Sequence, residues 1–180
     1  QFTPFEIDAA NYEENRHFFL SQYFKSKYDA AMKTLPNLTT GIKINRVEVW
    51  VTNKSGTTSN TRDIIALTDL GENSTVSNPV WGVTGQPVPA NTANSEYSAM
   101  VNQYADARQI DQTTTVLDGI PGFVGGSDYE KMEKARLLNS SEYTLNQALG
   151  YISLKTSLQT DQVLAVAYEY TYGGVTYQVG

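Results

Sequence analysis

The clearest alternation of apolar and polar positions lies near the end of the chain, in Val163–Val179 (VLAVAYEYTYGGVTYQV). Gly173 and Gly174 tolerate the positive φ of a tight primed turn, so we predict a β-hairpin folded across them. One register separates the apolar and polar residues of both strands onto opposite faces. The segment Val163–Ala167 is apolar on both faces, so we expect it to be held between other elements. The predicted pairs are Tyr172 with Val175, Tyr170 with Tyr177, Tyr168 with Val179, Thr171 with Thr176 and Glu169 with Gln178.

The first third of the chain predicts one helix and two strands. Asn11 and Glu14 have capping-box spacing, and apolar residues follow at helical intervals as far as Pro36, which ends the helix. Ile42–Val51 alternates as a strand whose phase changes at Asn45–Arg46, which indicates a β-bulge. Asp63–Leu70 is a second strand, and we predict that the two strands form an antiparallel pair. The apolar face of the helix is expected to contain Leu20, Phe24, Tyr28 (or Lys27), Ala31 and Leu35, widened by Phe19 and Tyr23.

The middle of the chain is less regular. Residues 73–94 are rich in Gly, Pro, Asn, Ser and Thr and predict a long irregular loop, either packed around Trp81 or a mobile insertion. After it we predict a helix over Ser95–Gln109, a short strand at Thr113–Leu117, and a helix over Tyr129–Leu138 capped by Asp128 or Ser127. The sequence therefore predicts an α+β fold, with a largely antiparallel sheet and about three helices packed on one face. A single domain is expected, with two small subdomains as the alternative.

Composition narrows the function classes. With 180 residues, a net charge of −6 and a pI near 4.7, the chain lacks the basic excess that nucleic acid or an anionic membrane surface requires. No apolar run approaches the roughly 20 residues of a membrane helix, so no membrane insertion of this segment is expected. The absence of Cys excludes disulfides and thiol chemistry. The chain begins at Gln1 without Met and stops at Gly180 in strand-like sequence, so we interpret it as a piece of a longer polypeptide.

Candidate chemistry is sparse. His17 is the only histidine, and no nucleophile elbow accompanies it, so a hydrolase is the weakest hypothesis. Gly119–Ser127 before a predicted helix superficially resembles a phosphate loop, but the Walker spacing is absent. Asp69, Glu72 and Asn73 offer oxygens for Ca²⁺ without matching an EF-hand, so a turn at the end of a strand is the better interpretation. The sequence thus predicts a non-catalytic protein without metal or cofactor.

The aromatic residues allow one further hypothesis. The chain has twelve tyrosines and two tryptophans, and aromatic faces can stack on sugar rings. Tyrosines on strands more often fill half-buried positions in a sheet. A carbohydrate-binding module is therefore the second hypothesis, and the candidate interaction surface contains Trp81, Tyr97 and Tyr104.

Three long segments resemble a known family. They are Phe18–Pro36 (FFLSQYFKSKYDAAMKTLP), Gly41–Glu72 (GIKINRVEVWVTNKSG with NTRDIIALTDLGE) and Leu138–Gly180 (from LNSSEYTLNQALGYISL to the closing hairpin). They resemble the SprA family, also called Sov, of very large outer-membrane translocon proteins of type IX secretion and gliding motility in Bacteroidota. Residues 73–94 add little to the resemblance.

The resemblance implies a parent protein that forms a giant barrel pore for folded cargo. This chain would then be a soluble, non-barrel region of it, at the outer membrane or cell surface on its periplasmic or extracellular side. The implied partners are other regions of the translocon, secretion-system subunits or cargo proteins. No catalytic motif is carried over from the family.

Overall fold

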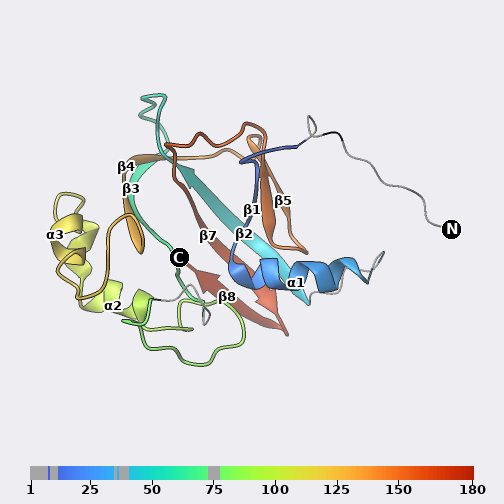
Figure 1. The fold of residues 1–180 in the computed structure, drawn as a ribbon, viewed down its shortest axis with the longest axis horizontal. Coiled ribbons are helices and arrows are strands. Elements are labelled where there is room, and N and C mark those ends of the chain that lie inside the picture. The colour runs from blue at the N-terminus through green and yellow to red at the C-terminus, as the bar shows by residue number, and fades with distance from the viewer. Residues whose placement is uncertain (1–7, 9–11, 35, 37–40, 73–77) are drawn as a thin grey trace.

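The structure, a computed structural model, describes residues 8, 12–34, 36, 41–72 and 78–180. In these residues two antiparallel sheets and three α-helices confirm the predicted α+β fold (Figure 1). The larger sheet has the strand order β3-β4-β2-β7-β8 and the smaller one β1-β6-β5. The elements are β1 (His17–Phe19), α1 (Gln22–Met32), β2 (Ile42–Val51), β3 (Thr61–Leu67), α2 (Glu96–Asn102), α3 (Thr113–Leu117), β4 (Tyr129–Leu137), β5 (Tyr143–Asn146), β6 (Tyr151–Leu154), β7 (Leu164–Tyr172) and β8 (Val175–Val179), with a 3₁₀ turn at Ala105–Arg108.

The C-terminal hairpin forms as predicted. β7 and β8 pair in the expected register from Tyr168↔Val179 to Tyr172↔Val175, across a turn with φ of 58° at Gly173 and 81° at Gly174. β8 is the edge strand, while β7 lies between β8 and β2. The predicted bulge in β2 is also present, because its register against β7 shifts between Ile44 and Arg46.

Two predictions about the sheet are wrong. β2 and β3 are not neighbours, because β4 lies between them. This strand occupies the segment in which we predicted a helix over Tyr129–Leu138. The three-residue spacing of its apolar positions has another cause: the register against β3 shifts in the middle of β4, near Lys134, whose φ is 49°. The bulge changes the strand's phase, so a helix-like spacing in sequence becomes a bent strand in space.

The predicted helices also differ in their bounds. The helix expected to start at Asn11, which lies outside the described residues, begins at Gln22, after the short strand β1. The helix predicted over Ser95–Gln109 is shorter, and a 3₁₀ turn follows it. Thr113–Leu117 is a helix, not a strand. Its three threonines suggested a strand by propensity, which tertiary context overrides here.

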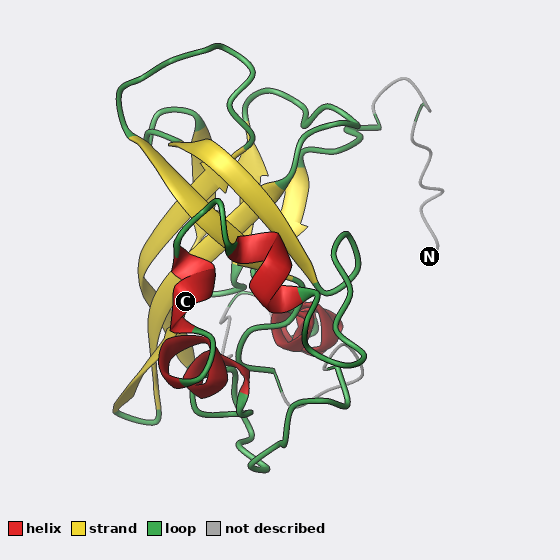
Figure 2. Ribbon diagram, turned by 90° about the vertical axis from the view of Figure 1, so that its left-hand side faces the viewer, coloured by secondary structure: helices red, strands yellow, loops and turns green. Residues whose placement is uncertain are grey.

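One apolar cluster joins the two sheets to α1. Phe24 of α1 is 3% exposed and packs edge-on against Tyr168 and Tyr170 of β7. The rest of this cluster includes Ile44 and Val49 of β2 and Ile152 of β6. A second cluster surrounds Trp81 beside α2 and α3, and a third lies under Trp50. Figure 2 shows most of the strands in the upper part of the view and the helices in the lower part, with loops at both ends.

The long loop is described from residue 78 onward, and there it is irregular and packed. Trp81 is 7% exposed within the second cluster, and Val88 and Ala90 are buried too. The Asn91 backbone N–H donates to the Gln178 carbonyl oxygen, which ties the loop to β8. Residues 78–94 therefore form the packed loop, which was one of the two alternatives predicted for residues 73–94. Residues 73–77 lie outside the described part of the chain.

Candidate functional site

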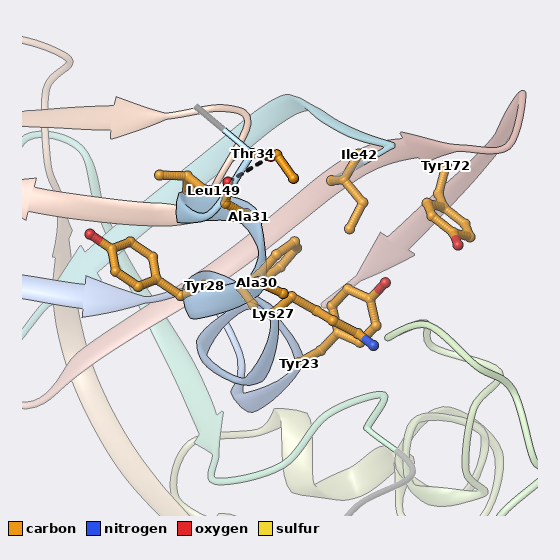
Figure 3. A pocket seen from close by; sticks show the side chains of 10 residues that line it. Tyr23, Lys27, Tyr28, Ala30, Ala31, Thr34, Ile42, Leu149 and Tyr172 are labelled. Carbon is orange, nitrogen blue, oxygen red and sulfur yellow. Dashed lines mark hydrogen bonds between the residues drawn. The ribbon is translucent and has the colours of Figure 1, made fainter. Parts of the chain in front are cut away.

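One hollow of the surface lies between α1 and the nearby ends of β2 and β7. It has a volume of about 320 Å³. Figure 3 shows Tyr23, Ile42 and Tyr172 turned toward this space, with the Lys27 amino group beside the Tyr23 ring. The Lys27 nitrogen lies 5.8 Å from the centre of that ring. We call this hollow the α1 groove; its lining is Tyr23, Phe24, Lys27, Tyr28, Ala30, Ala31, Thr34, Ile42, Leu149 and Tyr172.

The α1 groove offers aromatic faces, phenol hydroxyls and one ammonium group. No carboxylate or imidazole is among its lining residues. Burial raises the pKa of Tyr23, so this phenol stays protonated and can donate a hydrogen bond. Such a lining suits the binding of a protein side chain or peptide better than acid–base chemistry.

A larger hollow, which we call the β3–β7 cleft, separates β3 from the first half of β7. Its volume is about 1200 Å³; most of β3 and the stretch Leu164–Glu169 of β7 line it. Its walls combine apolar side chains, among them Phe18, Ile64 and Val166, with charged ones such as Glu130 and Glu169. At the rim Arg46 forms an ion pair with Glu48, and the Arg62 guanidinium lies 5.5 Å from the centre of the Trp50 ring.

His17 joins two other polar side chains at one side of this cleft. Its Nδ1 lies 2.8 Å from Ser153 Oγ and its Nε2 2.7 Å from Glu13 Oε2. The hydrogen bond from His17, helped by the Arg16 charge, holds the pKa of Glu13 below its usual range. A serine, a histidine and a carboxylate in a row have the connectivity of a hydrolase triad.

The setting of this trio favours a structural role. His17 and Glu13 side chains are each 49% exposed, so water solvates the groups that a hydrolase would keep desolvated. His17 and Ser153 are also directly opposite in the β1–β6 ladder, where a cross-strand hydrogen bond is expected. No local pattern indicated Ser153, because it lies 136 positions from His17 and only the strand pairing brings the two side chains together.

Buried acidic groups lie where β3 leads into the long loop. Glu72 is 8% exposed, and its two carboxylate oxygens accept the backbone N–H groups of Gln22 and Tyr23 at 3.1 and 2.8 Å. It therefore caps the first turn of α1 from a distant part of the chain. Asp69 Oδ1 accepts the Glu72 backbone N–H at 3.0 Å, and Asn94 Nδ2 donates to the Glu72 carbonyl oxygen at 3.1 Å.

Glu96, at the start of α2, completes this acidic region. Its side chain is 2% exposed, and burial raises its pKa to about 8, with smaller contributions from the charges of Asp69 and Asp128. In the described part of the chain, no group of three or more His, Cys, Asp or Glu residues could hold a metal ion. Asp69 and Glu72 thus serve the turn after β3 and the start of α1. Asn73, the third predicted oxygen donor, lies outside the described residues.

The three residues of the candidate interaction surface do not form one exposed patch in the structure. The Trp81 ring is buried against Phe123 and Tyr104, at centroid distances of 5.3 and 6.4 Å. Tyr104 is half-buried in the same cluster, and Tyr97 is half-buried on α2. Trp81 and Tyr104 therefore meet as core residues, and the Trp81 ring has no open face for stacking on a sugar.

The glycine-rich segment Gly119–Ser127 is followed by β4, so the helix N-terminus that a phosphate loop requires is not formed. Asp128 occupies the centre of this turn instead. Its carboxylate accepts the Val124 backbone N–H at 2.7 Å and the Asn78 side-chain amide at 2.9 Å. A fixed negative charge at this place disfavours an anionic ligand.

Comparison with known proteins adds no assignment. The chain matches no protein-family model, and no curated protein matches it. Among the described residues, none of the helices has the length and apolar character needed to cross a membrane.

Proposed function

We propose that this chain is a non-catalytic structural and interaction domain of an outer-membrane translocon of the SprA type, which serves type IX secretion and gliding motility. The observation that carries this proposal is where the family-like segments lie. Phe18–Pro36 contains α1, Gly41–Glu72 contains β2 and β3, and Leu138–Gly180 contains β5 to β8. These three segments contain every lining residue of the α1 groove and most of the lining of the β3–β7 cleft.

The chemistry of the two hollows supports a binding role. Their linings combine aromatic and aliphatic side chains with charged ones, as protein-binding surfaces do, and the cleft contains the Arg46–Glu48 ion pair. The His17 trio is solvated, and Glu96 lines neither hollow. We therefore propose that the domain contacts other regions of the translocon, secretion-system subunits or secreted cargo. Its location would be the outer membrane or cell surface, on the periplasmic or extracellular side.

The test uses a gliding strain whose own SprA-type protein contains this chain. Lys27→Glu reverses the only charge in the α1 groove, whereas Lys33→Glu, at the exposed end of the same helix, is the matched control. We expect Lys27→Glu to leave cargo in the periplasm and to slow gliding, at an unchanged outer-membrane level of the parent protein. The control should secrete and glide normally.

A second strain lacks the whole domain, with a short Gly/Ser linker in its place. Normal secretion and gliding in that strain, with the shortened parent protein still in the outer membrane, would contradict the proposed function. Equal defects from Lys27→Glu and Lys33→Glu would show that the α1 groove is not the contact surface.

A further inference from the structure

Three polar groups of the α1 groove form no hydrogen bond and no ion pair with any described residue. They are the hydroxyls of Tyr23 and Tyr172 and the ammonium group of Lys27, and all three belong to the lining (Figure 3). Burial raises the pKa of Tyr23, and the Tyr172 phenol adds to the shift, so the two hydroxyls lie within electrostatic reach of each other. Lys27 lies beside the Tyr23 ring. The groove therefore gathers hydrogen-bond donors that the chain itself leaves unused.

The buried part of the same lining is apolar. Phe24, Ala31, Ile42 and Leu149 are each less than a tenth exposed, whereas Lys27 lies at the exposed rim. The volume of about 320 Å³ is at the lower end of the range of ligand pockets, roughly 300–1,000 Å³. The groove thus has room for a few side chains, with an apolar floor and donors above it.

The surroundings of the groove are positively charged, although the chain as a whole has a net charge of −6. α1 and the residue after it carry Lys25, Lys27 and Lys33 against Asp29, and Lys43 follows at the start of β2. Among the described residues, no carboxylate forms an ion pair with any of these lysines. Their combined field attracts a negatively charged partner to this side of the molecule.

We infer that the α1 groove binds a segment of a partner protein in which an aspartate or glutamate neighbours an apolar residue. The apolar side chain packs on Phe24 and Ile42. The carboxylate accepts hydrogen bonds from Lys27 and from the hydroxyls of Tyr23 and Tyr172. A carboxylate only accepts hydrogen bonds, so it matches a lining that offers donors, and the charge of Lys27 strengthens the contact. The inference rests on the proposed function and deepens it by naming the chemistry of the partner.

An anionic lipid surface is the rival ligand for the same lysines. A membrane-bound helix presents several large apolar side chains to the lipid. In the described part of α1, Met32 is the only exposed side chain of this kind, at 37% exposure. A flat headgroup layer would also leave the recessed floor at Phe24 and Ile42 unfilled. The groove therefore favours a peptide over a membrane.

The first experiment selects a phage-displayed library of random octapeptides on the immobilised chain. We expect enrichment of peptides in which Asp or Glu stands beside Leu, Ile, Phe or Tyr. A synthetic enriched peptide with both ends capped should bind about tenfold more tightly than the same peptide with its acidic residue changed to the amide, because one charge-assisted contact is lost. Failure to enrich such peptides, or equal binding of the acid and amide forms, would overturn the inference.

Three variants locate the binding. Lys27→Gln removes the ammonium group and Tyr172→Phe removes only a hydroxyl, whereas the control Lys33→Gln lies outside the lining. With all three folded by circular dichroism, Lys27→Gln should weaken peptide binding about tenfold and Tyr172→Phe roughly threefold, with little change in the control. By NMR, the peptide should shift the amide signals of Ile42 and Tyr172 and leave those of β3 in place. Equal weakening by Lys27→Gln and Lys33→Gln, or shifts confined to β3, would contradict the proposed site.

The rival ligand and the proposed function have their own outcomes. Binding of the chain to phosphatidylserine vesicles that Lys27→Gln abolishes, without binding of any acidic peptide, would assign the groove to lipid and overturn the inference. Should acidic peptides bind the groove while removal of the domain leaves secretion normal, the proposed function would fail and the peptide site would stand. Should Lys27→Glu impair secretion while no acidic peptide binds, the inference would fail and the proposed function would stand.

Discussion

The carboxylate of Glu72 accepts the backbone N–H of Tyr23 at 2.8 Å, although 49 positions separate the two residues. Its other oxygen accepts the N–H of Gln22. The Ser21 side chain, at the N-cap, makes no capping hydrogen bond, so Glu72 supplies the cap that the local sequence does not. A negative charge at the N-terminus of α1 also interacts favourably with the helix dipole. The start of α1 is thereby fixed to the end of the β3 segment.

Replacing this cap should destabilise the fold. We expect Glu72→Ala to lower the free energy of unfolding by about 1–2 kcal/mol, because two N–H groups lose a buried acceptor. Glu72→Gln keeps one acceptor oxygen and should lose less. Urea denaturation measures the change, with Glu14→Ala at an exposed position as the control. A loss no greater than that of the control would show that water caps α1 equally well.

Gly150 should tolerate no side chain. Its φ is +65°, and a Cβ at this position would lie 2.3 Å from Cδ1 of Phe24, in the main core. We expect Gly150→Ala to cost about 2–5 kcal/mol, from left-handed backbone strain together with overpacking. Gly126 has a φ of +79° and nothing within 4 Å of its Cβ position, so Gly126→Ala measures the strain alone, about 1–2 kcal/mol. Equal losses in the two variants would show that Phe24 moves aside without cost.

The sequence predicted correctly those features that depend on residues close together in the chain. The hairpin register follows from the turn at Gly173–Gly174 and from alternation, and the β2 bulge follows from a phase change. β4 was missed because its own bulge produced a helix-like spacing. Its absence from the prediction then produced the wrong pairing of β2 with β3.

The candidate sites are formed by residues that lie far apart in the sequence and that strand pairing brings together. The spacing of residues along the chain does not predict such pairing. His17 was identified, but Ser153 was not, because the β1–β6 pairing brings them together. The β3–β7 cleft depends on the strand order, which makes β3 an edge strand separated from β7 by β4 and β2. The apolar stretch Val163–Ala167 was the available signal. Its expected place between other elements is confirmed, since Leu164 and Val166 pack against the cluster that contains Phe24 and Ala165 against the cluster under Trp50.

Trp81 should contribute to stability. It is buried in the second cluster, so Trp81→Ala should lower the free energy of unfolding by about 3–5 kcal/mol. Tyr97→Ala, at a half-buried position of α2, should cost less. Urea denaturation of both variants measures the difference. Loss of glycan binding in Trp81→Ala would therefore be informative only if urea denaturation shows that the variant is still folded. If Trp81→Ala were as stable as the unmodified chain, the Trp81 ring would not be packed in the core.

Glu96 should make the stability of the fold depend on pH. Its pKa is raised from 4.5 to about 8, chiefly by burial, and Asp69 and Asp128 add to the shift. The folded state then keeps the proton up to about pH 8, whereas the unfolded state releases it near pH 4.5. The free energy of unfolding must therefore fall as pH rises between these values. Glu96→Gln has no proton to release in this range, so it avoids this loss. The free energy of unfolding of the variant minus that of the unmodified chain should rise from near zero at pH 4.5 to on the order of a few kcal/mol at pH 8. Urea denaturation at several pH values measures this difference, with Glu14→Gln at an exposed position as the control. A difference that does not change with pH would show that Glu96 is ionised inside the fold.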